Sequence, residues 1–462
     1  MRPSAVIAAV EGGGTSFVVA VCICNSASST SINLNNNNNS EKDAIISATN
    51  LPQIIHRISI DSSHDDPHRT LRECVEFLQQ HKPRGGGYDV LAVGSFGPLG
   101  TKPGTPEYGT ILKSSPKAPW RKVDILTPLR NACSRSNDNN SNSNSNNNDD
   151  HPPLKVVLDT DVNAPAWGEY LLANSTVLSE TKVSARISSL AYITVGTGVG
   201  VGLVINDRPV HGWMHPEGGH VPVQPLETAT KKYKDDDDTT TTPTAPPTTV
   251  FTGYSWGIDT APFGGQNTVE GLSSSVALTE RLHQQQQQQH SASSSSLVFD
   301  RSILAQLSDD HEIWDHAANA LANLCVTLLL TVSVERIVLG GGLMQRTVLL
   351  EKIRQRTETL LNGYLDLPPL NDLIVTSQFG NDAGLMGTII LGQSVLLGIH
   401  NNNNNNDDNN NNNNNNKKLI REQEETEMKQ TAFGIGFMQG IMVGALTAAL
   451  VCKYCFVLPK RK

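Results

Sequence analysis

Residues 4–24 read SAVIAAVEGGGTSFVVAVCIC, and this stretch decides the fold. Two apolar runs, Ser4–Val10 and Phe17–Cys24, flank the turn Glu11-Gly12-Gly13-Gly14-Thr15. This pattern predicts a β-hairpin. Consecutive glycines let the backbone come close to a ligand and present its N–H groups, which suits a phosphate. One such turn is weak evidence, because most glycine-rich turns are only turns.

A second turn of the same kind occurs in the other half of the chain. Gly196-Thr197-Gly198-Val199-Gly200 joins the apolar runs Ser189–Val195 and Val199–Ile205. Two such hairpin turns, one in each half, predict a polyphosphate site much more specifically than one turn. No Gly-Lys-Ser/Thr follows either turn, which excludes a Walker A loop. A strand rather than a helix follows each turn, which excludes a dinucleotide-binding fingerprint.

Asp161 is the candidate catalytic residue, in the segment Asp159-Thr160-Asp161-Val162-Asn163-Ala164. The segment lies between a predicted buried strand, Lys155–Leu158, and a predicted helix. A carboxylate at the end of such a strand can accept a hydroxyl proton while the oxygen attacks phosphorus. The spacing is equally compatible with Asp161 or Asn163 as the cap of the helix.

Two further motifs have several interpretations. Gly340-Gly341-Gly342 follows the predicted strand Arg336–Leu339, and either lies against adenine or ribose or is only a strand-to-helix turn. His215-Pro216-Glu217-Gly218-Gly219-His220 suits a polyol, because a carboxylate and an imidazole offer directional acceptors and donors. A zinc site is a second interpretation of this segment, and six residues alone favour a polar surface turn.

Strand and helix patterns alternate along the rest of the chain. Helical spacing occurs in His68–His81, Asn163–Ala173, Glu312–Val332 and Gly384–Leu397, and a further strand pattern occurs in Val90–Val93. This alternation predicts an α/β protein with a mixed sheet in each half.

Polar low-complexity tracts interrupt these patterns and divide the chain. They cannot bury enough apolar surface to offset the entropy of ordering, so we expect mobile surface insertions. The tracts are Asn35–Asn39, Asn137–Asp150, Asp235–Thr249, Gln284–Ser296 and Asn401–Asn416. The predicted parts are an N-terminal α/β domain at 1–133, a disordered Asn-rich insertion at 134–153, a C-terminal α/β domain at 154–399 with polar insertions near 235–249 and 284–296, and a disordered linker at 400–431.

The composition excludes several classes of protein. With 462 residues, of which 38% are hydrophobic, the chain is long enough for two domains with cores. The formal net charge of -9 argues against a nucleic-acid binder, which needs clustered Lys and Arg. Seven scattered cysteines, an odd number, argue against a disulfide framework.

Together these motifs resemble the ROK sugar-kinase family and, within it, the bacterial-type fructokinases. The resemblance covers about residues 4–395 outside the polar tracts. The segments that carry it are Glu11–Thr15, Gly94–Leu99, Tyr108-Gly109, Ser115–Trp120, Gly196–Gly200, Arg208–Gly212, His215–His220, Gly340–Gly342 and Gly380–Leu385. It implies an actin-like (ribonuclease H-like) α/β fold, with two domains and a cleft between them that takes ATP and sugar.

The resemblance also implies roles for individual residues. Asp161 is the implied general base in the ATP-dependent phosphorylation of a hexose, most simply fructose to fructose 6-phosphate. Asn163, Glu217, His220 and Glu270 are the implied sugar contacts. The implied ATP and phosphate contacts are Gly13, Gly14, Thr15, Thr197, Gly198, Gly340, Gly341 and Gly342, with Mg²⁺ accompanying ATP and Glu11 as its indirect contact.

The sequence departs from the family pattern at several positions. Family members usually bind a structural zinc through a histidine, at the position of His220, and three cysteines. The corresponding stretch Thr260–Thr268 contains no cysteine, so we predict that this chain holds no zinc. Ser16 stands where a lysine is common, and Gly218 stands where an apolar residue is usual.

The C-terminal stretch 432–458 contains an uncharged, largely apolar run of twenty residues, Phe433–Cys452. As a helix it would span about 30 Å, the thickness of the hydrocarbon core of a bilayer. Gly436, Gly440 and Gly444 recur at a spacing of four, which suits helix packing in a membrane. The pattern predicts a transmembrane tail anchor that places the kinase on the cytosolic face of an intracellular membrane. A buried or amphipathic helix is the alternative.

The expected function is therefore a membrane-tethered fructokinase. The expected partners are ATP, a hexose and a membrane, with a homodimer left open and no nucleic acid. A non-catalytic sensor of sugar or nucleotide is one alternative, and a kinase for glucose or mannose is another. A repressor of the same family does not fit, because only ten residues precede Glu11 and leave no room for a DNA-binding motif.

Overall fold

The computed structural model describes residues 4–25, 51–62, 65–83, 86–135, 152–175, 186–224, 226, 267–289 and 302–399. These residues belong to one compact unit, Met1–Asn401. The predicted linker at 400–431 and membrane anchor at 432–458 lie outside the described residues, as do most of the insertion at 134–153 and all of that at 235–249. The anchor, the localisation and the homodimer therefore stay predictions.

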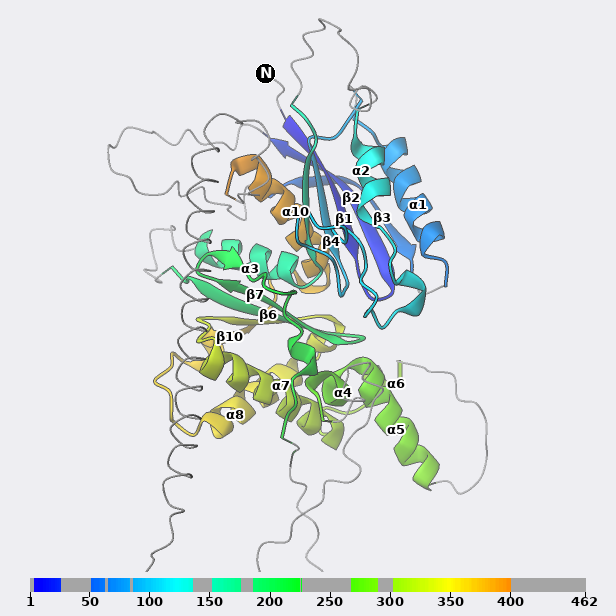
Figure 1. The fold of residues 1–462 in the computed structure, drawn as a ribbon. Helices are drawn as coiled ribbons and strands as arrows, with labels where there is room; N and C mark the ends of the chain where they lie inside the picture. The colour runs from blue at the N-terminus through cyan, green and yellow to red at the C-terminus, as the bar shows by residue number, and fades with distance from the viewer. Residues whose placement is uncertain are drawn as a thin grey trace, which may run out of the picture. The chain divides into compact units, whose positions relative to one another are not determined.

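The first sheet has the strand order β3-β2-β1-β4-β5 (Figure 1). Its strands are β3 (Gln53–Asp61), β2 (Ser16–Asn25), β1 (Ser4–Gly12), β4 (Val90–Ser95) and β5 (Lys155–Thr160). β1 and β2 pair antiparallel, which confirms the first predicted hairpin, whereas β4 and β5 run parallel to β1. The carboxyl ends of β1, β4 and β5 therefore meet at one edge of the sheet, which is where α/β proteins bind ligands.

Helices cover both faces of this sheet. α1 (Pro67–Gln80) and α2 (Leu126–Cys133) lie on one face, and α10 (Ala383–Leu397) lies on the other (Figure 1). Successive residues of β1 serve the two faces, because Ala8 belongs to the core under α1 and α2 while Ile7 and Ala9 belong to the core under α10. Because both faces of β1 are covered, its sequence is a continuous apolar run, and this run is what makes the strand recognisable.

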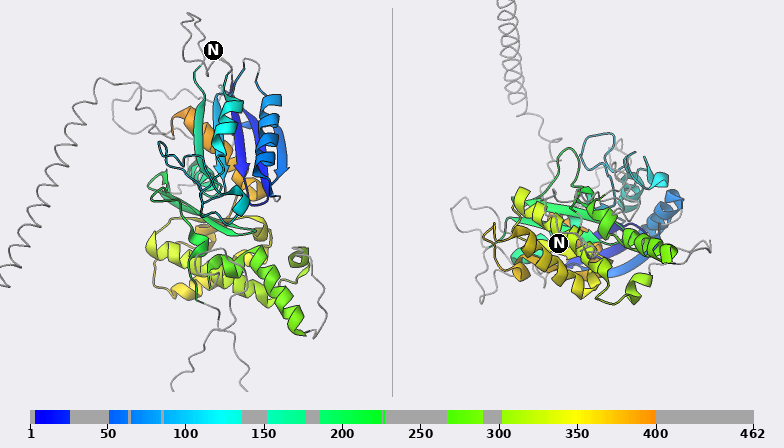
Figure 2. Two further views of the ribbon diagram at one scale, coloured as in Figure 1. Left: turned by 45° about the vertical axis from the view of Figure 1, so that its right-hand side comes forward. Right: turned by 90° about the horizontal axis from the view of Figure 1, so that it is seen from below.

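The second sheet has the order β10-β9-β6-β7-β8. Its strands are β10 (Ile374–Thr376), β9 (Ile337–Gly340), β6 (Ser189–Val195), β7 (Val199–Ile205) and β8 (Arg208–Pro209). β6 and β7 pair antiparallel, which confirms the second predicted hairpin. The helices of this half are α4 (Val269–Ser273), α5 (Ser275–Gln289), α6 (Ser302–Gln306), α7 (Glu312–Thr331), α8 (Thr347–Leu361) and α9 (Leu370–Leu373). α4, α7 and α8 lie on one face of the sheet (Figure 1 and Figure 2).

A pair of helices lies between the two sheets. α3 (Asn163–Ser175) packs on β6 and β7, α10 packs on β1 and β4, and the two helices contact each other. They cross closely, since a Cβ on Gly168 would stand 3.1 Å from the Cα of Gly387. The indole N–H of Trp167 donates to the hydroxyl of Ser394 at 2.9 Å across the same contact. Asp161 at the start of α3 is thereby fixed relative to both sheets.

Two features of the fold differ from the sequence-based division. β5 follows the predicted boundary at 134–153 and still pairs with β4 of the first sheet, and α10 returns to that sheet from the end of the described chain. In addition, α5 continues to Gln289, so the polar tract that begins at Gln284 starts inside a helix. Glutamine is a good helix former, and a tract that extends an existing helix needs no new nucleation.

Within the described residues, one helix is long and apolar enough to cross a membrane, namely Ile313–Thr331. It forms most of α7, and 72% of its most apolar window is buried inside the fold. Its apolar side chains, including Leu321 and Leu324, belong to the core of the second sheet. The membrane span predicted at 432–458 lies outside the described residues, so this result does not bear on it.

Candidate active site

Asp161 lies directly after β5, at the edge where three parallel strands end. Its backbone N–H donates to the carbonyl oxygen of Ser95 at the end of β4, at 2.9 Å. The sequence left open whether Asp161 or Asn163 caps α3. The hydroxyl of Thr160 accepts the N–H of Asn163 at 3.0 Å, so Thr160 makes the capping bond. The carboxylate of Asp161 is therefore not needed to start the helix.

The surroundings of Asp161 favour proton exchange near neutral pH. Burial raises the pKa of Asp161 to about 7, the charge of Lys117 opposes this rise, and the carboxylate of Glu217 adds to it. A carboxyl group whose pKa lies near the working pH can hold and release a proton, as a general base must. The base assignment suggested by the motif is therefore also chemically suitable.

The first glycine turn adjoins this edge. The backbone N–H of Gly13 donates to the carbonyl oxygen of Ser16 at 2.8 Å and closes the turn. The backbone N–H of Phe96, just after β4, donates to the carbonyl oxygen of Gly12 at 2.7 Å. Across from it stands the second turn, since a Cβ on Gly14 would lie 3.8 Å from the Cβ of Thr197. The two predicted phosphate turns, from different sheets, thus face each other.

Glu11 lies beside the first turn, in an acidic environment. A Cβ on Gly13 or on Gly384 would stand 3.0 Å from its carboxylate, so glycines make room for this side chain. The pKa of Glu11 is raised to about 8, chiefly by burial and also by the charges of Asp161 and Asp382, while the charge of Arg57 opposes the rise. Carboxylates gathered in this way would be stabilised by a cation.

The turn Gly340–Gly342 ends β9 beside the second glycine turn. Gly341 has φ of +89°, and a Cβ there would also press on the backbone of Val195, so the position requires glycine. Gly342 faces open space and lines a cavity. The two interpretations of this motif are therefore compatible, since one glycine makes the turn and its neighbour leaves room for a ligand.

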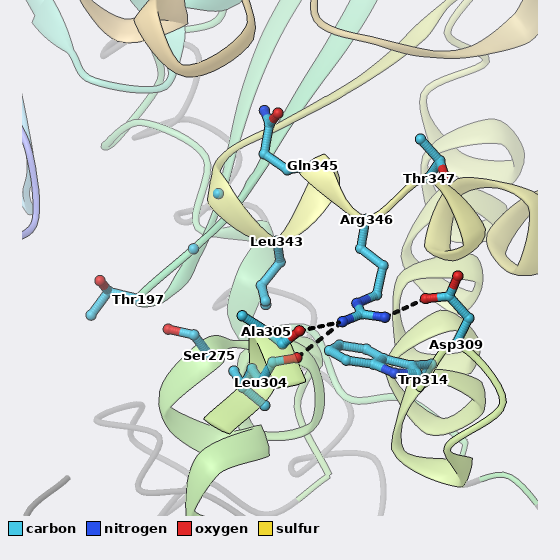
Figure 3. A pocket seen from close by; sticks show the side chains of 12 residues that line it. Thr197, Ser275, Leu304, Ala305, Asp309, Trp314, Leu343, Gln345, Arg346 and Thr347 are labelled. Carbon is cyan, nitrogen blue, oxygen red and sulfur yellow. Dashed lines mark hydrogen bonds and ion pairs between the residues drawn. The ribbon is translucent and has the colours of Figure 1, made fainter. Parts of the chain in front are cut away.

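The cavity has a volume of about 710 Å³, within the range of small-molecule sites (Figure 3). Its lining comprises Gly196, Thr197, Ser275, Leu304, Ala305, Asp309, Trp314, Gly342, Leu343, Gln345, Arg346 and Thr347. The guanidinium of Arg346 lies 4.4 Å from the ring centre of Trp314. It is held there by an ion pair with Asp309 and by a hydrogen bond to the carbonyl oxygen of Leu304 at 3.1 Å. A flat, rigid wall of this kind suits an aromatic base.

Glu217 lies close enough to Asp161 for its charge to raise the pKa of Asp161. The Glu217 carboxylate is 3.7 Å from Nε2 of His220 and 3.5 Å from Nδ1 of His215. The short 3₁₀ turn Gly218–His220 rests directly on β7, because a Cβ on Gly219 would overlap the carbonyl oxygen of Val199. A Cβ on Gly218 would stand 2.6 Å from the side chain of Val201, which explains why this chain has glycine there.

The other two predicted sugar contacts, Asn163 and Glu270, make hydrogen bonds to the backbone of the second sheet. Asn163 is fully buried, and its amide accepts the N–H of Leu203 and donates to the carbonyl oxygen of Val210, both at 3.2 Å. The carboxylate of Glu270 accepts the N–H of Val199 at 2.9 Å and lies against Gly198 of the second turn. Asn163 thus fastens α3 to the second sheet, and Glu270 supports the second turn.

Sequence reasoning missed a pair near Asp161 that joins a buried carboxylate to a partly exposed histidine. The carboxylate of Asp159, 2% exposed, lies 3.0 Å from Nε2 of His211. Burial lowers the pKa of His211, but the hydrogen bond and the charge of Asp159 outweigh burial, so its pKa is raised. The pair joins β5 to the loop that carries Glu217. Their separation of 52 residues in sequence gave no signal that the two side chains meet.

Among the described residues, no group of three or more His, Cys, Asp and Glu side chains is arranged to hold a metal ion. Most of Thr260–Thr268, where family members carry zinc-binding cysteines, lies outside the described residues. The absence of zinc therefore stays a prediction.

Comparison with known proteins agrees with this architecture. The ROK family matches residues 40–395. The chain is 24% identical to a fructokinase of Pediococcus pentosaceus over 390 residues, 84% of this chain and 98% of the relative. It is 26% identical to a fructokinase of Zymomonas mobilis over 384 residues, 83% of this chain and 94% of the relative.

A solved structure shares the fold. The crystal structure of a ROK family glucokinase from Streptomyces griseus in complex with glucose and AMPPNP superposes with a TM-score of 0.51 at 16% identity, and covers 85% of this chain and 99% of that chain. This likeness confirms the predicted actin-like arrangement of two sheets. Because the family match spans most of its length, the chain belongs to the ROK family.

Proposed function

We propose that this chain is an ATP-dependent hexose kinase and that fructose is its substrate. The observation that carries the proposal is Asp161, whose half-buried carboxyl group has a pKa raised to about 7 and interacts electrostatically with Glu11, beside the first glycine turn, and with Glu217. Relatives that span most of the chain and are named fructokinase support the choice of sugar.

In the proposed reaction, a hydroxyl oxygen of the hexose attacks the γ-phosphorus of ATP. The bond between that phosphorus and the β,γ-bridging oxygen breaks, and ADP leaves with the electron pair. The hydroxyl proton passes to the carboxylate of Asp161. Positioning and electrostatic stabilisation account for most catalysis of this type, which suits two facing turns that offer backbone N–H groups.

Mg²⁺ enters this reaction with ATP, as part of the substrate. It generally keeps several waters and takes one or two carboxylates together with phosphate oxygens. Glu11 is the described carboxylate best placed for this, directly or through water, because it lies beside the first turn in an acidic environment. The sugar hydroxyls would bond to Glu217 and His220, which offer an acceptor and a donor.

The adenosine part of ATP would occupy the cavity between Thr197 and Gly342. We expect the substitution Ala305→Trp to fill that cavity, because Ala305 is an exposed residue of α6 that lines it. The KM for ATP should rise by about tenfold or more, which corresponds to about 1.4 kcal/mol of binding, while the KM for the hexose stays the same. Initial rates at varied ATP measure this effect.

The matched control for this cavity test is Gln306→Trp, the next residue of the same helix, which does not line the cavity. It should leave both KM values unchanged. Equal effects of the two substitutions on ATP would place the nucleotide elsewhere.

The choice of sugar is tested by kcat/KM for fructose, glucose and mannose with the full chain. We expect fructose to give the highest value, by about tenfold, and ³¹P NMR to show phosphate on C6. A higher value for glucose or mannose would replace fructose as the substrate. Lack of turnover with every hexose would remove the kinase proposal itself.

A further inference from the structure

Lys117 lies next to the reacting centre, and the proposed reaction has not yet used it. It precedes the short 3₁₀ turn Ala118–Trp120, in the chain between β4 and α2. Its ammonium nitrogen Nζ donates to the carbonyl oxygen of Gly13 in the first phosphate turn at 3.4 Å. The same atom stands 4.0 Å from the ring centre of Phe96.

The position of this ammonium group is fixed by aromatic packing. Phe96 meets Trp120 edge to face, with ring centres 5.3 Å apart, and Trp120 stacks on Phe17 at 5.0 Å. The backbone N–H of Trp120 donates to the carbonyl oxygen of Lys117 at 3.0 Å, which holds the lysine backbone to the same cluster. A lysine held in this way loses less entropy when it binds a ligand than a lysine on the surface.

The charge of Lys117 reaches the catalytic carboxylate. Burial lowers the pKa of Lys117 to about 8, Asp161 opposes this shift, and Lys117 in turn lowers the pKa of Asp161. An ammonium group has three N–H donors. One of them donates to the carbonyl oxygen of Gly13, and the contact with the ring of Phe96 is a cation–π contact rather than a conventional hydrogen bond. Donors therefore remain for a ligand between Asp161 and the first turn, where the phosphoryl group must pass.

We propose that Lys117 is a catalytic residue whose ammonium group binds the oxygens of the γ-phosphoryl group while it moves from ADP to the sugar. This rests on the proposed kinase function and deepens it. The phosphorus–oxygen bond to ADP breaks, the bond to the sugar oxygen forms, and the sugar proton goes to Asp161. Lys117 gains and loses no proton, and it stabilises negative charge on the transferred group.

The test compares Lys117→Met, Lys117→Arg and, as a control, Lys113→Met, which removes an exposed lysine from the same loop. Methionine keeps an unbranched side chain on Phe96 but removes the charge. We expect Lys117→Met to lower kcat by about 100-fold, as for removal of one charged donor from a reacting oxygen. The KM for the hexose should change little, and Lys113→Met should behave as wild type.

Two readouts separate a catalytic from a merely structural role. By calorimetry, Lys117→Met should weaken binding of a non-hydrolysable ATP analogue about tenfold while ADP binding is unchanged, since only the former carries a γ-phosphoryl group.

The second readout is the acidic limb of the kcat/KM profile. In the part of the chain that the structure describes, the groups shown to interact electrostatically with Asp161 are Lys117, Glu217, Glu11 and Tyr192. Loss of the Lys117 cation should move that limb upward by about one pH unit.

Lys117→Arg should keep the acidic limb in place, because it keeps the charge, and should recover part of kcat. The inference would be overturned if Lys117→Met kept the kcat, the analogue binding and the acidic limb of an active wild type. That result would leave the kinase proposal standing. An equal fall in analogue and ADP binding, with a lower unfolding temperature in both Lys117 variants, would reduce Lys117 to a structural residue. A wild type without hexose-dependent turnover would overturn both proposals.

Discussion

We expect the substitution Asp161→Asn to lower kcat for hexose phosphorylation by about 10³-fold or more, since it would remove the group proposed to accept the hydroxyl proton. Asparagine has nearly the same shape and no basic oxygen, so the packing at the end of β5 and the bond between the Asp161 N–H and Ser95 are retained. The measurement is hexose-dependent ADP release at saturating ATP. Retention of more than a tenth of the wild-type kcat would remove Asp161 from the mechanism.

The same residue sets the pH dependence of the wild type. Because the pKa of Asp161 is about 7, kcat/KM should fall as the pH decreases through that value and the carboxylate becomes protonated. The effect on stability has the opposite sign. A carboxyl group whose pKa is raised by folding destabilises the fold when it ionises, so Asp161→Asn should unfold at the same or a higher temperature than wild type at pH 8. A lower unfolding temperature would attribute the loss of activity to misfolding.

We expect the substitution Gly202→Ala to destabilise the protein by about 2–3 kcal/mol, because it would overpack a close contact. Gly202 lies in β7 under the start of α3, and a Cβ there would overlap the carbonyl oxygen of Val162 and stand 2.9 Å from the backbone nitrogen of Asn163. Backbone atoms cannot turn away, so β7 and α3 must separate. Activity should fall as well, because Asp161 adjoins Val162. Denaturant unfolding and initial rates measure the two effects.

Gly212→Ala is the matched control for this substitution. A Cβ at Gly212 would lie 3.9 Å from the nearest atom, the carbonyl oxygen of Met214, so the free energy of unfolding should not change. Equal stability of the two alanine variants would contradict the close contact between β7 and α3.

Local patterns made much of the fold predictable from sequence. The side chains of β1 and β2 cover two buried faces, so both strands are apolar runs, and glycines separate them. The same holds for β6 and β7, and both hairpins were therefore predicted. The helix predicted at Glu312–Val332 is α7, because apolar residues recur there at helical spacing. The edge strand β3 was missed, since most of its residues are exposed and no buried pattern marks it.

Long-range features could not be predicted in the same way. The pairing of β5 with β4 depends on contacts across a polar insertion, and α10 reaches the first sheet only because glycines let it cross α3 closely. Asn163 shows the same limit within the site. An amide beside the base suggested a sugar contact, but the position inside α3 directs it to Leu203 and Val210. Lys117 acquires its setting from Phe96 and Gly13, which lie in other segments.

The central claim is that the two glycine turns and Asp161 transfer a phosphoryl group from ATP to a hexose. The most direct measurement is ADP release by the purified full chain with ATP and Mg²⁺, with and without fructose, beside Asp161→Asn. We expect release that depends on fructose in the wild type and is nearly absent in the variant. Release that ignores the hexose, or that persists in the variant, would contradict the claim.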